Sequence, residues 1–125
     1  MPETFAFAFD RVYQPLLALA GIFPGRADVM VDDDELRVRF GMLTLTTPRS
    51  NIASAQVTGP HNPLKAIGVR TSFTDRGLTF GSSAGRTTCI LFQQPVRTRP
   101  FDVARHPGLT VSVERPDDLA ALLNP

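Results

Sequence analysis

Apolar and polar residues alternate along most of the chain, with the two-residue period of strands that bury one face. The pattern begins at Phe5–Phe9, returns at Leu36–Phe40 and is clear again at Leu109–Val113. Glycine and proline separate the alternating segments, as expected for turns. We therefore predict about seven to nine short antiparallel strands, drawn from residues 5–9, 27–31, 36–40, 42–46, 52–58, 67–73, 78–80, 87–92 and 109–113.

Two segments follow the helical period instead. Pro15 opens the helix-forming run Leu16–Ala20, which Gly21 closes, so one or two helical turns are expected there. Pro116 suits the first position of a longer helix over residues 116–123, in which leucines recur at i, i+3 and i+4. Residues 10–26 otherwise carry no pattern that fixes their conformation.

The whole chain, residues 1–125, is expected to be a single domain. Its 125 residues are 42% hydrophobic and 20% charged, ordinary values for a globular fold. We divide it into an N-terminal strand with a short helix or loop (1–26), a β-rich core (27–114) and a C-terminal helix (116–123). Successive strands followed by one helix predict a mainly β fold, a curved sheet or partial barrel whose open edge or end the helix covers.

Net charge, cysteine content and the lack of a targeting segment bear on where the protein is located more than on what it does. The formal net charge is +1, which disfavours nucleic acid as a partner. Cys89 is the single cysteine and has no partner for an internal disulfide. The N-terminus lacks a basic signal-peptide region, and the apolar run Leu16–Phe23 is too short to span a bilayer. We expect a cytoplasmic location and no transmembrane segment, while peripheral contact with a membrane stays open.

Positive charge gathers in the connection Gln93–Pro107, a long segment for a compact domain. Such connections often carry function, and arginines there suit acidic side chains. Two more arginines project from the predicted strand Leu36–Phe40, opposite its apolar face. Our first hypothesis is a non-catalytic module that binds a protein segment or a small acidic ligand. The candidate binding residues are Arg97, Arg99, Arg105, His106, Arg37 and Arg39.

A second hypothesis, from another class, is a small hydrolase or isomerase. His61 or His106 would act as general base beside Asp102 or Asp75. The chain contains neither a Gly-x-Ser-x-Gly elbow nor a His-Glu-x-x-His metal motif, so this is the weaker reading, and we expect no cofactor and no metal. A third possibility is a structural homo-oligomer formed through an uncovered strand.

Two polar loops invite ligand interpretations that their spacing does not favour. The acidic turn Asp32–Glu35 lacks the alternation and central glycine of an EF-hand loop, so we interpret it as a solvated hairpin turn. Gly81–Arg86 could form an anion nest but lacks the lysine and spacing of a P-loop, so a flexible hairpin loop is expected.

The segment Thr47–Val57, in which a proline and an isoleucine introduce the next strand, resembles the strand connection of bacterial pleckstrin-homology-like domains. Four other segments are similar to uncharacterised actinobacterial proteins: residues 31–41, 57–60, 75–80 and 105–109. The two resemblances together cover roughly residues 27–124. The resemblance implies a seven-stranded barrel capped by a helix, a scaffold that binds phosphoinositides, peptides or proteins. Because the first hairpin turn is acidic here, phosphoinositide binding is disfavoured.

Overall fold

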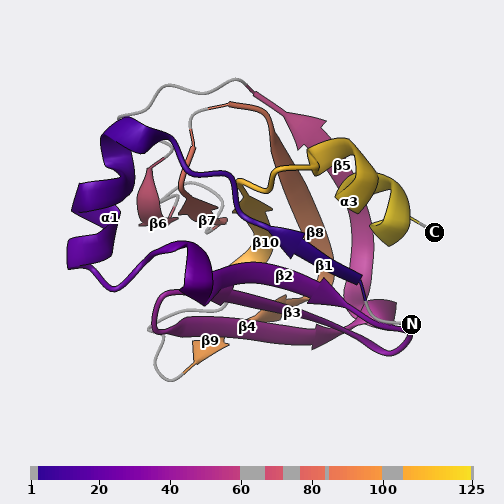
Figure 1. Ribbon diagram of the computed structural model, residues 1–125. Coiled ribbons are helices and arrows are strands. Elements are labelled where there is room, and N and C mark those ends of the chain that lie inside the picture. Colours follow the sequence, from indigo (N-terminus) through magenta and orange to yellow (C-terminus); the bar gives the residue numbers. More distant parts are fainter. Residues whose placement is uncertain (1–2, 60–66, 72–76, 84, 100–105, 125) are drawn as a thin grey trace.

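One five-stranded sheet has the order β1-β2-β3-β4-β9 and joins four strands of the N-terminal half to a short strand from the C-terminal half (Figure 1). The computed structural model describes residues 3–59, 67–71, 77–83, 85–99 and 106–124. Every neighbouring pair in this first sheet is antiparallel. The strands are β1 (Glu3–Ala6), β2 (Ala27–Val31), β3 (Glu35–Phe40), β4 (Leu43–Pro48) and β9 (Thr98–Arg99).

The other five-stranded sheet has the order β5-β8-β10-β7-β6. Its β7 and β10 run parallel, which corrects the expectation of antiparallel pairing throughout. Parallel neighbours need a crossover connection, which β8 and the chain after it provide. The strands are β5 (Ile52–Thr58), β6 (Gly68–Thr71), β7 (Leu78–Gly81), β8 (Thr87–Val96) and β10 (His106–Val111).

Helical segments join and cover the sheets. Between β1 and β2 the chain forms η1 (Arg11–Tyr13), α1 (Gln14–Leu19) and η2 (Pro24–Arg26), so the predicted helical turn is confirmed. A further turn, η3 (Arg49–Asn51), links β4 to β5. The predicted C-terminal helix is α3 (Pro116–Leu123), and within the described ranges no helix has the length and apolar run that a membrane crossing requires.

A short backbone bridge links the two sheets beside the end of β1, and over the described ranges they do not close into a barrel. Phe7, just after β1, forms a bridge with Val113, just after β10. The backbone N–H of Ala8 donates to the carbonyl of Ser112 at 2.7 Å, beside that bridge. Over the described ranges the structure is therefore mainly β, with two sheets packed face to face and no closed barrel.

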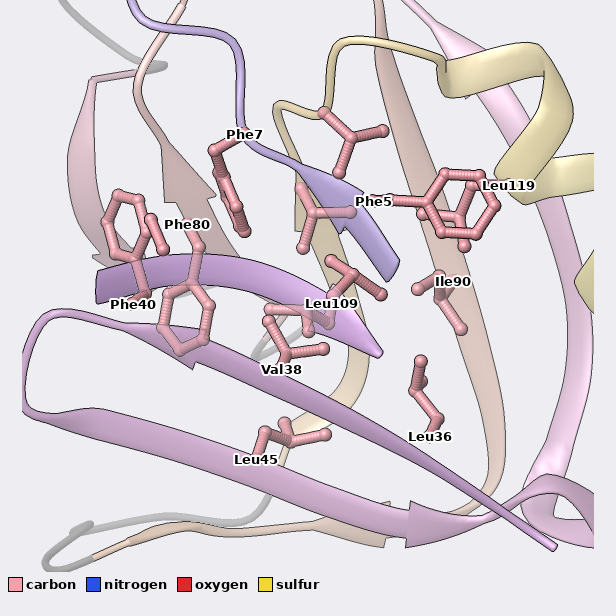
Figure 2. Close-up of a cluster of buried hydrophobic side chains, with 14 of the residues drawn as sticks. Phe5, Phe7, Leu36, Val38, Phe40, Leu45, Phe80, Ile90, Leu109 and Leu119 are labelled. Carbon is pink, nitrogen blue, oxygen red and sulfur yellow. The ribbon is translucent and has the colours of Figure 1, made fainter. Parts of the chain in front are cut away.

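The core lies between the sheets and follows the alternation that the sequence predicts. The Phe40 ring of β3 packs between those of Phe7 and Phe80, with centroids 5.1 and 5.0 Å away (Figure 2). Leu119 of α3 is fully buried in the same cluster. Burying one such side chain contributes about 1.5–3 kcal/mol, so these inward positions fix which face each strand presents.

The helix α3 packs against β5 and β8, and the residue after it reaches the edge of the second sheet. The Asn124 carboxamide accepts a hydrogen bond from the N–H of Ala55 at 2.9 Å and donates one to its carbonyl at 2.7 Å. Because β5 is the terminal strand of its sheet, this side chain occupies the place of a neighbouring strand. The expectation that the helix covers an open edge is confirmed at this position.

The prediction of a long connection over residues 93–107 is partly wrong. β8 continues to Val96, β9 follows at Thr98–Arg99, and His106 already belongs to β10. Gln93–Pro95 shows no clear alternation because β8 extends here beyond the end of β5, where both faces and one edge are less enclosed. Residues 100–105 lie outside the described ranges.

Candidate binding site

Arg37 and Arg39 project from the outer face of the first sheet. They alternate along β3 with Leu36, Val38 and Phe40, all of which are buried. Since successive side chains of a strand point to opposite faces, burial of the three apolar residues directs both guanidinium groups to solvent. The predicted placement of this pair is confirmed.

Strand register brings a third predicted arginine to this face. Arg39 lies opposite Thr44 of β4, and Thr44 in turn lies opposite Arg99 of β9. Adjacent strands lie about 4.8 Å apart, so about 10 Å separates the backbones of Arg39 and Arg99. Arg37 lies opposite Thr46, one pleat further along β4. The outer surface of the first sheet therefore carries threonines flanked by arginines.

A surface groove of about 540 Å³ opens where β8 passes into β9. Both Arg97 and Arg99 line it, and both are exposed. β9 pairs only with Thr44 and Leu45, and over the described ranges no strand pairs with the final residues of β4 on this side, where the end of β8 faces them across the groove. The groove is lined by Thr46, Thr47, Asn51, Pro95, Val96, Arg97 and Arg99.

One wall of the groove is held rigidly by Asn51. Its carboxamide accepts a hydrogen bond from the N–H of Gln94 at 2.8 Å and donates to the Gln94 carbonyl at 2.9 Å. The same amide nitrogen lies 3.0 Å from the Thr47 hydroxyl oxygen and donates to it. These bonds join β4 and η3 to the end of β8, so the groove exists before a ligand arrives.

The arginines of this face differ in how far they are already neutralised. Arg39 forms a two-pronged ion pair with Asp28, with nitrogen–oxygen distances of 3.0 and 2.5 Å. Hydrogen bonding to Asp28, and the charge of that carboxylate, raise the pKa of Arg39. Arg37 contacts Glu35 more loosely, at 3.4 Å. Neither Arg97 nor Arg99 forms an ion pair with any other described residue, so on this face the uncompensated positive charge lies at the groove.

The remaining predicted site residues do not join the groove. His106 is 2% exposed and begins β10, where it pairs with Val96 behind the groove wall, so the expected accessible loop position for this imidazole is wrong. Its burial follows from the pairing of β10 with β8, which a single segment does not reveal. Arg105 lies outside the described residues.

Of the residues in the enzymatic hypothesis, the structure describes His106 alone, and this imidazole is buried. The other three residues of that hypothesis lie outside the described residues; they are His61, Asp75 and Asp102.

The two polar loops have structural contacts. In the acidic turn, the Asp32 carboxylate accepts backbone hydrogen bonds from Asp34 and Glu35, both at 2.8 Å, and these bonds lower the pKa of Asp32. In the second loop, Arg86 forms a two-pronged ion pair with Asp117 of α3. Among the residues described, no three potential metal ligands lie together.

Sequence reasoning missed the uncharged part of the groove, chiefly Thr46, Thr47 and Asn51. The available signal was the polar run around Pro48, since two threonines precede this proline at the end of β4 and polar residues, Asn51 among them, follow it. Nothing local, however, places this run beside residues 94–99, which lie more than 40 positions later.

Compared with known proteins, the chain matches no family model, no curated protein and no solved structure. The function proposed for this protein therefore rests on the geometry of the site.

Proposed function

We propose that this protein is a non-catalytic binding domain that holds an acidic, extended protein segment in the groove between β4 and the β8–β9 junction. The observation that carries the proposal is the pair Arg97 and Arg99, exposed on a preformed groove and without ion-pair partners among the described residues. A charged pair left without counterions favours an anionic ligand, because binding then adds attraction without breaking an existing ion pair.

The segment would extend the first sheet along the part of β4 that β9 leaves uncovered. Backbone hydrogen bonds to a sheet edge supply affinity for any extended chain, and alternate side chains supply specificity. Carboxylates of the segment would reach Arg97 and Arg99 on one side and Arg37 across Thr46. Arg39 contributes less in this arrangement, because Asp28 already occupies its guanidinium group.

Another sheet edge is less suited to the same role. The backbone of Ala55, in the middle of the terminal strand β5, is already bonded to Asn124. An incoming strand would have to displace that side chain and lose both hydrogen bonds. A segment that binds in the groove beside β4 would not have to displace Asn124.

We propose further that the fold is a variant of the pleckstrin-homology-like scaffold. Two features support this: two largely antiparallel sheets packed against each other, and a terminal helix, α3, that lies over β5 and β8. That scaffold serves peptide and protein ligands as well as lipids, so the fold accommodates the proposed activity without specifying it.

The proposal is tested by fluorescence anisotropy with a labelled peptide of alternating glutamate and threonine, which is extended and acidic. We expect Arg97→Ala and Arg99→Ala each to weaken binding about two- to fivefold, the usual value of an exposed charged contact. Thr46→Glu should weaken it more, since it places a carboxylate on the groove.

The matched control is Arg86→Ala, which removes another exposed arginine, one that pairs with Asp117 and does not line the groove. This variant should bind the acidic peptide as the unaltered protein does, and a lysine–threonine peptide should not bind. Equal affinity in the groove variants and the unaltered protein would refute the assignment of the site.

A further inference from the structure

The helical stretch formed by η1 and α1 exposes an apolar face to solvent. Val12, Leu16 and Leu19 follow the i, i+4, i+7 spacing and are 76%, 64% and 88% exposed. A different side of the same stretch packs inward through Leu17, which is buried, and Tyr13, which is half-buried. An amphipathic surface helix normally places polar residues outward, so this outward face is the reverse of the usual pattern.

The exposed face carries no charge but has arginines at both ends. From Val12 to Gly25 the sequence has no acidic or basic residue, while Arg11 precedes this run and Arg26 follows it. The Arg26 guanidinium lies over the Phe23 ring, 5.5 Å from its centroid. Over the described ranges neither arginine forms an ion pair.

The turn between β3 and β4 extends this surface. Gly41 lies against the corner that follows α1: its N–H donates to the carbonyl of Arg26, and a side chain at this position would meet Ile22. The next residue, Met42, is 64% exposed, and Phe23 is also exposed. Figure 1 shows α1 at the end of the molecule opposite α3 and the chain termini. The apolar surface therefore forms one projecting end of the domain.

We propose that this end of the protein inserts into the interface of an anionic membrane. With six residues α1 is about 9 Å long, far short of the roughly 30 Å needed to span a bilayer, so it would lie in the interface. Apolar side chains enter the acyl boundary there, while flanking arginines meet lipid phosphates and carboxylates.

Charge favours a membrane over a second copy of the chain as the occupant. A symmetric dimer would place this face against itself, and the face has no acidic residue to pair with Arg11 or Arg26. An anionic lipid surface supplies both the apolar layer and the negative charge. The surface is separate from the groove residues, so each proposal can fail without the other.

The test exploits the absence of tryptophan from the sequence. Leu19→Trp places a single reporter at a highly exposed position, where the larger side chain is tolerated. We expect its emission to shift to shorter wavelength when phosphatidylcholine vesicles containing about 30% phosphatidylserine are added to the full chain. In the same background, Leu16→Glu should weaken vesicle binding by at least about tenfold, the effect of losing one buried leucine.

The charged ends are tested separately. Arg11→Ala and Arg26→Ala should each weaken binding to the anionic vesicles about fivefold, and have no such effect with pure phosphatidylcholine. Leu91→Trp, on an exposed position of the second sheet, is the matched control and should show no shift.

The proposal is overturned if the emission of the Leu19→Trp reporter stays unchanged with both kinds of vesicle. It is also overturned if the Leu91→Trp control shifts equally. A concentration-dependent shift without vesicles, accompanied by dimer formation in sedimentation velocity, would instead assign the face to self-association. Circular dichroism of each variant confirms that it is folded.

Discussion

The Asn124 side chain offers a sharp test of how the terminal helix stabilises the second sheet. It exchanges two hydrogen bonds with the backbone of Ala55 and donates a third to the carbonyl of Ala120 at 2.9 Å. A net contribution of about 0.5–1.5 kcal/mol per bond, reduced because water can reach a sheet edge, gives about 1–3 kcal/mol for all three. We expect Asn124→Ala to lower the free energy of unfolding by this amount.

Asn124→Asp should be more harmful at neutral pH, although it preserves the shape. The introduced carboxylate faces two carbonyl oxygens, of Ala55 and Ala120, and lies at the negative end of α3. We expect these two effects to outweigh the hydrogen bond that the Ala55 N–H still donates to the carboxylate, and so to raise the pKa of its folded state above the ordinary value of about 3.9. A group with a raised folded-state pKa stabilises when protonated, so this variant should lose stability as the pH rises from about 4 through the folded pKa.

The assay is urea unfolding followed by far-ultraviolet circular dichroism, repeated between acidic and neutral pH. Gln56→Ala is the matched control, because Gln56 is an exposed polar residue beside Ala55 on the same strand. It should change the free energy of unfolding by less than about 0.5 kcal/mol. A change as small in Asn124→Ala, or an Asn124→Asp variant whose stability relative to the unaltered protein does not vary with pH, would refute this account of the edge.

Three further predictions concern the core and the turns. Phe40→Ala should cost about 3–5 kcal/mol in urea unfolding, because the ring is buried between two other phenylalanines of the core. Gly41→Ala should lower the thermal midpoint, since φ is 65° and the added carbon would lie 2.8 Å from Ile22 Cγ1; an unchanged midpoint would contradict that contact. Asp32 has a lowered pKa, so its stabilising effect is present above the usual value of 3.8 and is lost as the pH falls through the folded-state pKa. Asp32→Asn should therefore show a weaker loss of stability on acidification, measured by thermal melts, than the unaltered protein.

The pairing of β2, β3 and β4 was predictable because it is local. The hairpin of residues 27–40 needed only two alternating segments and a polar turn between them. The helix α3 was predictable for the same reason, since its proline, acidic first turn and leucine spacing all lie within eight residues. By contrast, β9 is two residues long and pairs with β4 more than 50 positions earlier, so no local period marks it.

The candidate site divides in the same way between sequence and structure. The sequence by itself determined that the chain is β-rich, that Arg37 and Arg39 face away from an apolar strand face, and that basic residues gather after residue 96. Only the tertiary structure decided that Arg97 and Arg99 share a groove with Asn51, that Asp28 already pairs with Arg39, and that His106 is buried. The physical reason is that alternation fixes the face on which a side chain lies, whereas strand register between distant segments fixes which side chains meet.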